Sequence, residues 1–203
     1  MDRILRLLYQ PYKWLVFFPL FFIITCIMVL IGIVVLIFFD DYAANRTTGV
    51  WWARLAGSIT PMRVRVAGRE HIVKGRSYVI VSNHQSMYDV LVLYGWLGLD
   101  LKWVIKKELR KVPVIGFAAE KGGNVFIDRS DPRGAYLSLE AAKKKIINGT
   151  SIIILPEGTR SRTGELGEFK KGAFWLAREL KLPILPVSIS NTRAILPPRT
   201  FDL

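Results

Sequence analysis

SYVIVSNHQSMYD, residues 77–89, is the stretch from which we predict the fold. The apolar run SYVIV is typical of a buried strand, and Ser82 and Asn83 directly after it are residue types that cap helices. We therefore predict a strand over 77–81 and a helix that continues to about Trp96. A buried strand followed at once by a helix is the repeating unit of a largely parallel α/β sheet.

The same alternation continues along the chain. We predict short strands over 101–105, 124–127, 151–155 and 184–189, and helices over 138–148 and 169–180. MRVRVA, residues 62–67, alternates apolar and basic side chains, which is typical of a half-exposed edge strand. The expected fold class is therefore α/β, with a mixed, largely parallel sheet flanked by helices.

The N-terminal region has a different character. Trp14–Phe39 contains no charged residue, and as a helix its 26 residues would extend roughly 39 Å, more than the hydrocarbon core of about 30 Å. A cleaved signal peptide is disfavoured, because the run is too long for its apolar region and Asp40 and Asp41 follow it. We expect a retained membrane-anchoring helix over 14–39.

A second helix is expected over about 45–59, where Trp51 and Trp52 are adjacent. Tryptophans in this position indicate a helix at the level of the lipid headgroups, and packing against the protein core is the alternative. The expected organisation is a membrane anchor over residues 1–59 and an α/β domain over residues 60–203.

The formal net charge is +13 in 203 residues. Residues 1–13 carry +2 and residues 14–39 carry none, so the remaining domain carries +11. Such a domain favours an anionic membrane surface, phosphate-bearing substrates or an acidic protein donor. Nucleic acid is not expected, because the basic residues are dispersed and no nucleic-acid-binding motif is present. The single cysteine, Cys26, lies in the apolar run, which argues against a catalytic thiol.

The two histidines, His71 and His84, lie in different surroundings. His71 follows a charged turn and is expected at the surface, and no clustered set of metal ligands can be assembled, so no metal site is expected. In one regular helix His84 and Asp89 would be about 140° apart. A contact between them requires His84 in the turn before the helix and Asp89 inside its first turns.

In that arrangement Asp89 would accept a hydrogen bond from one ring nitrogen of His84, and the other nitrogen could take a proton. A polar residue near a helix terminus, without a catalytic role, is the alternative. No serine occupies a G-x-S-x-G turn. A base without a protein nucleophile would activate a substrate hydroxyl or water.

Two further polar stretches follow predicted strands, where open α/β sheets bind ligands: GNVFIDR at 123–129 and LPEGTRS at 155–161. Arg129 leaves the first, and its planar guanidinium suits a phosphate, with a structural Asp–Arg pair as the alternative. The second supplies the candidates Glu157, Gly158, Thr159 and Arg160. They offer a carboxylate that could orient an arginine, a tight turn, a hydroxyl and a second guanidinium; an ordinary basic loop is the alternative.

Four motifs occur in order: NHQSMYD at 83–89, GNVFIDR at 123–129, LPEGTRS at 155–161 and LPILPVSI at 182–189. Together they resemble the four blocks of the glycerophospholipid acyltransferase family, and most closely its bacterial 1-acylglycerol-3-phosphate (lysophosphatidate) acyltransferases. The resemblance covers roughly residues 60–200. Leu155 stands where a phenylalanine is common, and family members usually continue beyond the fourth block, so a C-terminal truncation is one interpretation of the short tail.

The resemblance implies a role for each candidate. His84 would be the general base and Asp89 would orient it. Arg129, Glu157, Gly158, Thr159 and Arg160 would form the substrate phosphate site. Lys106, in VIKKEL, would bind phosphate or support the oxyanion, with a solvated surface lysine as the alternative, and Pro186 would shape the acyl channel.

The implied reaction is acyl transfer from acyl-CoA or acyl carrier protein to the free sn-2 hydroxyl of lysophosphatidate, giving phosphatidate. It needs no acyl-enzyme and no cofactor. The implied partners are membrane lipids, and the implied location is the inner membrane with the active domain on the cytoplasmic face. The alternatives are another lysophospholipid or glycerol-3-phosphate as acceptor, or a non-catalytic membrane lipid-binding protein.

Overall fold

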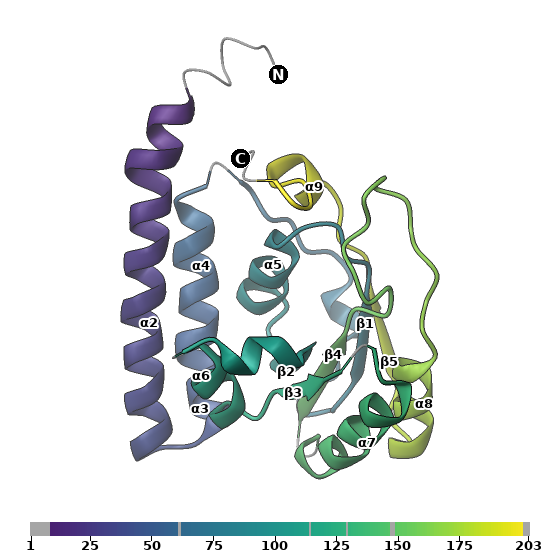
Figure 1. Ribbon diagram of the computed structural model, residues 1–203. Coiled ribbons are helices and arrows are strands. Elements are labelled where there is room, and N and C mark those ends of the chain that lie inside the picture. The colour runs from purple at the N-terminus through teal and green to yellow at the C-terminus, as the bar shows by residue number, and fades with distance from the viewer. Residues whose placement is uncertain (1–8, 61, 114, 129, 147–148, 201–203) are drawn as a thin grey trace.

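The computed structural model describes residues 9–60, 62–113, 115–128, 130–146 and 149–200 (Figure 1). Five strands form one sheet in the order β3-β2-β4-β1-β5. They are β1 (Val79–Ser82), β2 (Asp100–Lys106), β3 (Val125–Ile127), β4 (Thr150–Ile154) and β5 (Ile184–Val187). Each strand pairing in the described chain is parallel, where a mixed, largely parallel sheet was expected. The predicted α/β class is confirmed.

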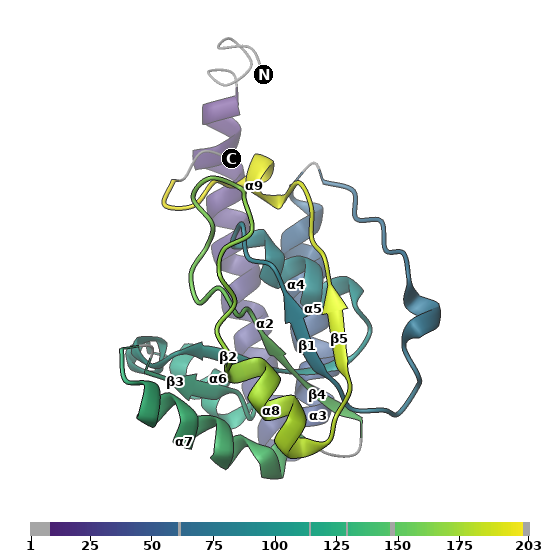
Figure 2. The same cartoon turned by 90° about the vertical axis from the view of Figure 1, so that its right-hand side faces the viewer.

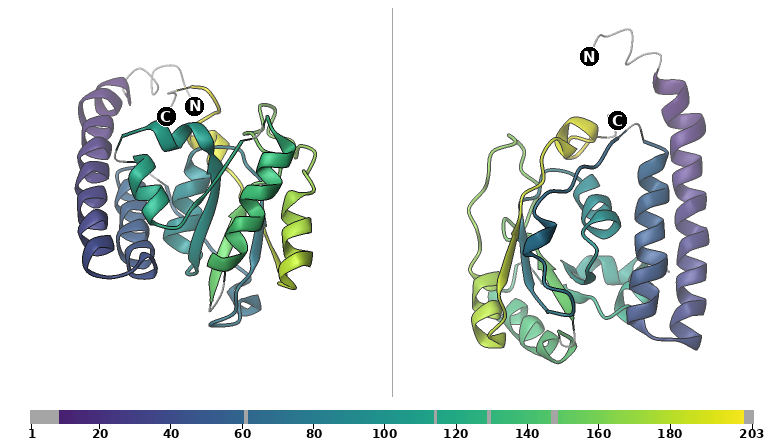
Figure 3. Two further views of the ribbon diagram at one scale, coloured as in Figure 1. Left: turned by 60° about the horizontal axis from the view of Figure 1, so that its bottom comes forward. Right: turned by 180° about the vertical axis from the view of Figure 1, so that it is seen from behind.

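Helices cover both faces of the sheet (Figures 2 and 3). α5 (Tyr88–Trp96) lies on one face, and α7 (Pro132–Ala142) and α8 (Gly172–Leu180) lie on the other. Successive strand residues point to opposite faces, so Val79 packs in the cluster with α7 and α8 and Ile80 packs in the cluster with α5. Burial on both faces explains the continuous apolar run in the sequence.

Short elements complete the α/β part. They are α6 (Ile115–Lys121), α9 (Thr192–Ile195) and the 3-10 turns η3 (Arg69–His71), η4 (Lys107–Lys111) and η5 (Lys143–Lys145). The helix predicted over 138–148 begins earlier, at Pro132, because proline favours the first turn of a helix.

The edge strand predicted over 62–67 is wrong. In the described chain residues 62–68 form no strand, and β5 occupies the edge next to β1. Residues 62–67 could form a strand only beside another strand whose backbone groups are free. β5 already pairs with the side of β1 that faces away from β4.

The N-terminal region is a helical hairpin beside this sheet. It comprises η1 (Lys13–Phe17), α2 (Phe18–Phe38), α3 (Asp41–Ala44), η2 (Asn45–Gly49) and α4 (Val50–Ser58). α2 and α4 run antiparallel (Figure 1). Gly32 of α2 permits the close approach of η2, since a β-carbon there would lie 3.2 Å from Oγ1 of Thr48.

The two helices of the hairpin have different surroundings. Ala53 and Ala56 of α4 are fully buried, and α4 packs against α5, so α4 is packed against the protein core. By length and composition, one helix in the described chain, Tyr9–Phe38, is long and apolar enough to cross a membrane. Its outer face exposes large side chains such as Phe22 and Ile37. This apolar surface points to association with a membrane.

Candidate active site

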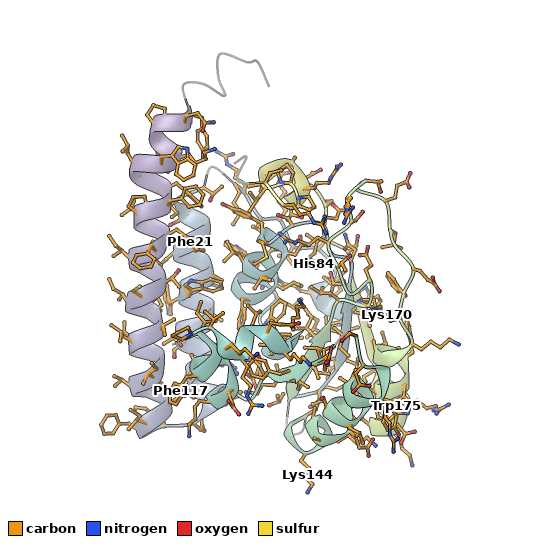
Figure 4. All side chains as sticks on the ribbon, in the orientation of Figure 1. Phe21, His84, Phe117, Lys144, Lys170 and Trp175 are labelled. Carbon is orange, nitrogen blue, oxygen red and sulfur yellow. The ribbon has the colours of Figure 1, made fainter. Side chains whose placement is uncertain are left out.

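The carboxyl ends of the parallel strands meet at one edge of the sheet, and the candidate site lies there. The chain leaves β1 at Ser82 and enters α5 at Tyr88, so His84 lies in the turn before the helix and Asp89 in its first turn. Nδ1 of His84 is 2.8 Å from Oδ2 of Asp89. The Asp89 side chain is fully buried and the His84 side chain is 13% exposed. The predicted contact is confirmed (Figure 4 labels His84).

Hydrogen-bond donors surround the carboxylate of Asp89. Its Oδ2 accepts from the backbone N–H groups of Gln85 (2.7 Å) and Ser86 (2.9 Å), and its Oδ1 accepts from Oγ1 of Thr192 (2.5 Å). An ionised carboxylate only accepts, so Nδ1 of His84 is the donor in this pair. The Nε2 atom of His84 therefore carries the lone pair and can act as a base.

The loop after β4 fixes the backbone of His84. Oε1 of Glu157 accepts from the His84 N–H at 2.7 Å, and the Ser161 N–H donates to the His84 carbonyl at 2.8 Å. Oε2 of Glu157 accepts from the Gly167 N–H at 3.0 Å. Both oxygens of Glu157 thus bind backbone groups, whereas the sequence suggested an arginine partner. Glu157 joins the loop after β4 to the turn that carries His84.

Asn83 has a structural position. Its side-chain amide donates to the carbonyl of Ile189 and its side-chain oxygen accepts from the Ile189 N–H, both at 2.8 Å. These two bonds imitate a further step of the β1–β5 ladder. They hold the segment after β5, including α9, beside the turn that contains His84.

Thr192 is a site residue that the sequence did not reveal. It lies in α9, 103 positions from Asp89, and its side chain is buried. No local motif marks a threonine that is brought to the carboxylate only by the path of the chain after β5. Its contact could not be inferred without the tertiary structure.

Replacing Thr192 with valine is expected to lower roughly tenfold the kcat of a reaction that uses His84 as its base, with little change in KM, because one donor to a buried charged group is lost. Thr192→Ser keeps the hydroxyl and is the matched control, expected to retain most of the activity. Steady-state kinetics of both purified variants give the measurement. Equal kcat for Thr192→Val and the wild type would contradict the role of this contact.

The remaining candidates of the loop after β4, residues 158–160, lie between Glu157 and Ser161, which both bind the His84 backbone. Gly158 has φ +74°, in the left-handed region that favours glycine, so the tight turn is confirmed. Thr159 is exposed and Arg160 is partly exposed in the same loop. Arg129 lies outside the described residues. Asp128, its neighbour, binds the Lys107 ammonium, which holds the pKa of that carboxyl well below its usual range.

Two candidates lie apart from the dyad. Lys106 ends β2, with its side chain half exposed and its ammonium 3.2 Å from Oε1 of Glu108. Pro186 is exposed on the edge strand β5, opposite Val81, where a missing N–H is tolerated.

In the part of the chain that the structure describes, no group of three or more His, Cys, Asp or Glu side chains could hold a metal ion.

A histidine base oriented by a buried aspartate, at the carboxyl edge of a parallel sheet, defines a site for activating a hydroxyl or water. The Acyltransferase family model matches residues 63–190, which include all four motifs. The chain belongs to the Acyltransferase family.

A solved structure and two curated relatives agree with this family assignment. The crystal structure of the 1-acyl-sn-glycerophosphate (LPA) acyltransferase PlsC from Thermotoga maritima is similar with a TM-score of 0.75 and 30% identity, covering 99% of this chain and 80% of that chain. A chloroplastic 1-acyl-sn-glycerol-3-phosphate acyltransferase of Brassica napus is 34% identical over 86% of this chain and 51% of its own length. The corresponding Helicobacter pylori protein is 37% identical over 56% of this chain and 48% of its own. The chain spans about half the length of the curated relatives it matches.

Proposed function

We propose that this protein transfers an acyl group from an acyl thioester to the free sn-2 hydroxyl of lysophosphatidate. The observation that carries the proposal is the 2.8 Å contact of His84 Nδ1 with a buried, fully hydrogen-bonded Asp89. The names of the relatives support lysophosphatidate as the acceptor. Acyl-CoA and acyl carrier protein are the two donors to be compared.

The proposed mechanism uses the free Nε2 of His84. Nε2 removes the proton of the sn-2 hydroxyl, and the oxygen attacks the thioester carbonyl, forming a C–O bond. Collapse of the tetrahedral intermediate breaks the C–S bond, and the thiolate takes the proton back from the imidazolium. Asp89 stabilises the imidazolium between these two steps. No covalent acyl-enzyme and no cofactor are involved.

The substrate phosphate is proposed to bind beside the loop after β4. Arg160, Thr159 and the turn at Gly158 would form one side of this site. Lys106 at the end of β2 and Arg129, which follows β3 in the sequence, are the further candidate ligands. Glu157 contributes by holding the loop against the His84 backbone. A guanidinium binds a phosphate through two parallel hydrogen bonds, which favours a phosphomonoester headgroup.

Acyl-transfer assays with purified protein test this proposal directly. Lysophosphatidate, lysophosphatidylethanolamine and glycerol-3-phosphate are offered as acceptors, each with acyl-CoA and with acyl carrier protein as donor. We expect the highest kcat/KM with lysophosphatidate. A preference for another acceptor would overturn the assignment of substrate, and inactivity with every pair would overturn the enzymatic function.

We further propose that residues 1–59 anchor the protein to the inner membrane and that residues 60–203 form the catalytic domain on the cytoplasmic face. Both ends of the hairpin contact the α/β part. At one end Phe17 lies in a buried cluster with Tyr88 and Leu91 of α5, and at the other the Asn45 amide donates to the Gly122 carbonyl at 3.4 Å. This attachment favours a hairpin that enters the membrane from one side with its outer face.

Single cysteines placed at exposed Pro11 and Tyr42, in a Cys26→Ala background, test this topology. We expect both to react with a membrane-impermeant maleimide in inside-out vesicles and neither to react in right-side-out spheroplasts. Labelling of the two ends from opposite sides would indicate a full crossing. Labelling of both only from the outside would contradict the cytoplasmic location.

A further inference from the structure

A cavity of about 760 Å³ opens between α7, α8 and the carboxyl ends of β2, β3 and β4. Its volume falls in the range of about 300–1,000 Å³ that is usual for small-molecule sites. Apolar side chains form most of its wall, among them Val104, Ile127, Leu139 and Ile154. Tyr136 of α7 and Trp175 of α8 also line it, with ring centroids 4.2 Å apart.

The charged groups of this cavity, Lys170, Lys171 and Arg178, are all cationic. Lys170 lies against the loop after β4, since a β-carbon on Gly158 would be 3.1 Å from its Nζ atom. The preceding residue, Glu157, binds the backbone of His84. The Glu157–Gly158 turn therefore contacts the His84 backbone through Glu157 and the cavity through Gly158. In the view of Figure 4, Lys170 lies between His84 and Trp175.

The combination of an apolar wall and adjacent ammonium groups selects among the possible ligands. It fits an amphiphile in which an anionic group lies close to a hydrocarbon chain. In lysophosphatidate only a glycerol separates the acyl chain from the phosphate. In an acyl-CoA the thioester beside the chain is uncharged, and the phosphates lie at the far end of the pantetheine arm. The cavity therefore matches the acceptor better than the donor.

We propose that the cavity between α7 and α8 holds the acyl chain of the lysophosphatidate acceptor and that Lys170 binds its phosphate. This inference rests on the proposed function and adds a place for the acceptor's chain. The chain lies along Leu139, Tyr136 and Trp175, and the sn-2 hydroxyl extends past the Gly158 turn toward Nε2 of His84. Pro186, which was expected to shape the acyl channel, does not line this cavity.

Chain-length dependence tests the apolar part. Ala135 of α7 lines the cavity, and Ala135→Trp fills it. Leu137→Trp is the matched control, because Leu137 lies on the same helix, is 57% exposed and is not part of the wall. We expect Ala135→Trp to raise KM for oleoyl-lysophosphatidate at least about tenfold, since several methylenes lose their burial, and to leave hexanoyl-lysophosphatidate within about twofold.

Leu137→Trp is expected to change neither value. Two outcomes overturn the proposal. In one, Ala135→Trp affects long and short acceptors equally. In the other, its effect follows the chain length of the donor thioester, which would place the donor's chain in the cavity. Thermal unfolding of both variants checks that the fold is retained.

The charged part is tested with Lys170→Gln, with Lys144→Gln as control. Lys144 is exposed and points away from the site at the end of α7 (Figure 4). Loss of a charge-assisted contact is expected to raise KM for lysophosphatidate roughly tenfold in Lys170→Gln. Lys144→Gln should match the wild type. Equal KM values for the two variants would show that Lys170 does not bind the phosphate.

A binding measurement separates this inference from the proposed function. Lysophosphatidate with a brominated acyl chain quenches nearby tryptophans, and the difference between wild type and Trp175→Phe isolates the signal of Trp175. We expect strong quenching of Trp175, lost in Ala135→Phe, which fills the cavity without adding a tryptophan. Acyl transfer without Trp175 quenching would overturn the cavity and leave the function. Quenching without transfer to any acceptor would overturn the function and leave the cavity.

Discussion

Replacing His84 with alanine is expected to lower the rate of acyl transfer by about 10²–10⁴-fold. Nε2 of His84 is the only position in the dyad that can accept the proton of the attacking hydroxyl, because Nδ1 donates to Asp89. The loss should appear in kcat, with a small effect on KM, since the base acts on the reacting hydroxyl and not on the chain or the phosphate. Radiolabelled acyl transfer with purified protein gives the measurement.

His71→Ala is the matched control for this substitution. His71 is the second of the two histidines, and its side chain is 78% exposed in η3. We expect wild-type turnover from it. His84→Ala should also bind liposomes as the wild type does. Near-wild-type turnover in His84→Ala would reject the mechanism, and the basic, membrane-associated chain would then be a non-catalytic lipid-binding protein.

Asp89→Asn is expected to reduce kcat by roughly 10²–10³-fold. The substitution removes the attraction between the carboxylate and the imidazolium, which is about 4 kcal/mol at close range. The backbone N–H groups of Gln85 and Ser86 both point at the Oδ2 position. Because these N–H groups donate, the amide oxygen of the substituted side chain takes the Oδ2 position and still accepts from Nδ1 of His84. The amide nitrogen then faces the Thr192 hydroxyl, and the His84 tautomer is retained. The substitution therefore separates the charge of Asp89 from its role in orienting His84.

Asp100→Asn controls for the removal of a buried carboxylate. Asp100 is 5% exposed, accepts from the Thr150 hydroxyl at 2.8 Å, and begins β2 at the opposite edge of the sheet from His84. The kcat of Asp100→Asn should equal that of the wild type. Thermal unfolding of both variants is measured in parallel. Retention of more than a third of wild-type kcat in Asp89→Asn would show that the imidazolium does not need this charge.

The hairpin illustrates a limit of sequence patterns. The apolar run over 14–39 identifies a membrane-associating helix, because no soluble exterior could hold so many exposed apolar side chains. The helix after it left two alternatives open. Trp51 and Trp52 suggested a headgroup-level helix, yet Ala53 and Ala56 carry its packing against α5. Small residues give no strong pattern, and their burial depends on a partner helix that lies far along the chain.

The sheet shows a similar division. Buried strands were predictable where both faces are covered, as in β1 and β4, because a short, continuous apolar run bounded by turn residues is typical of such strands. The alternation at 62–67 gave a wrong strand, since pairing depends on which edge is vacant. Edge position was decided by β5, which the internal Pro186 also restricts to an edge.

By itself, the sequence determined the α/β class with a largely parallel sheet, the apolar N-terminal helix and the contact of His84 with Asp89, because each depends on residues close together in the chain. The tertiary structure alone decided what surrounds that contact. Thr192 reaches Asp89 across 103 positions and Glu157 reaches His84 across 73. Such contacts exist only because parallel strands bring their carboxyl ends to one edge, where loops distant in sequence meet. The stretch 77–89 placed the base at that edge, and the loops after β4 and β5 fixed its backbone and its partner.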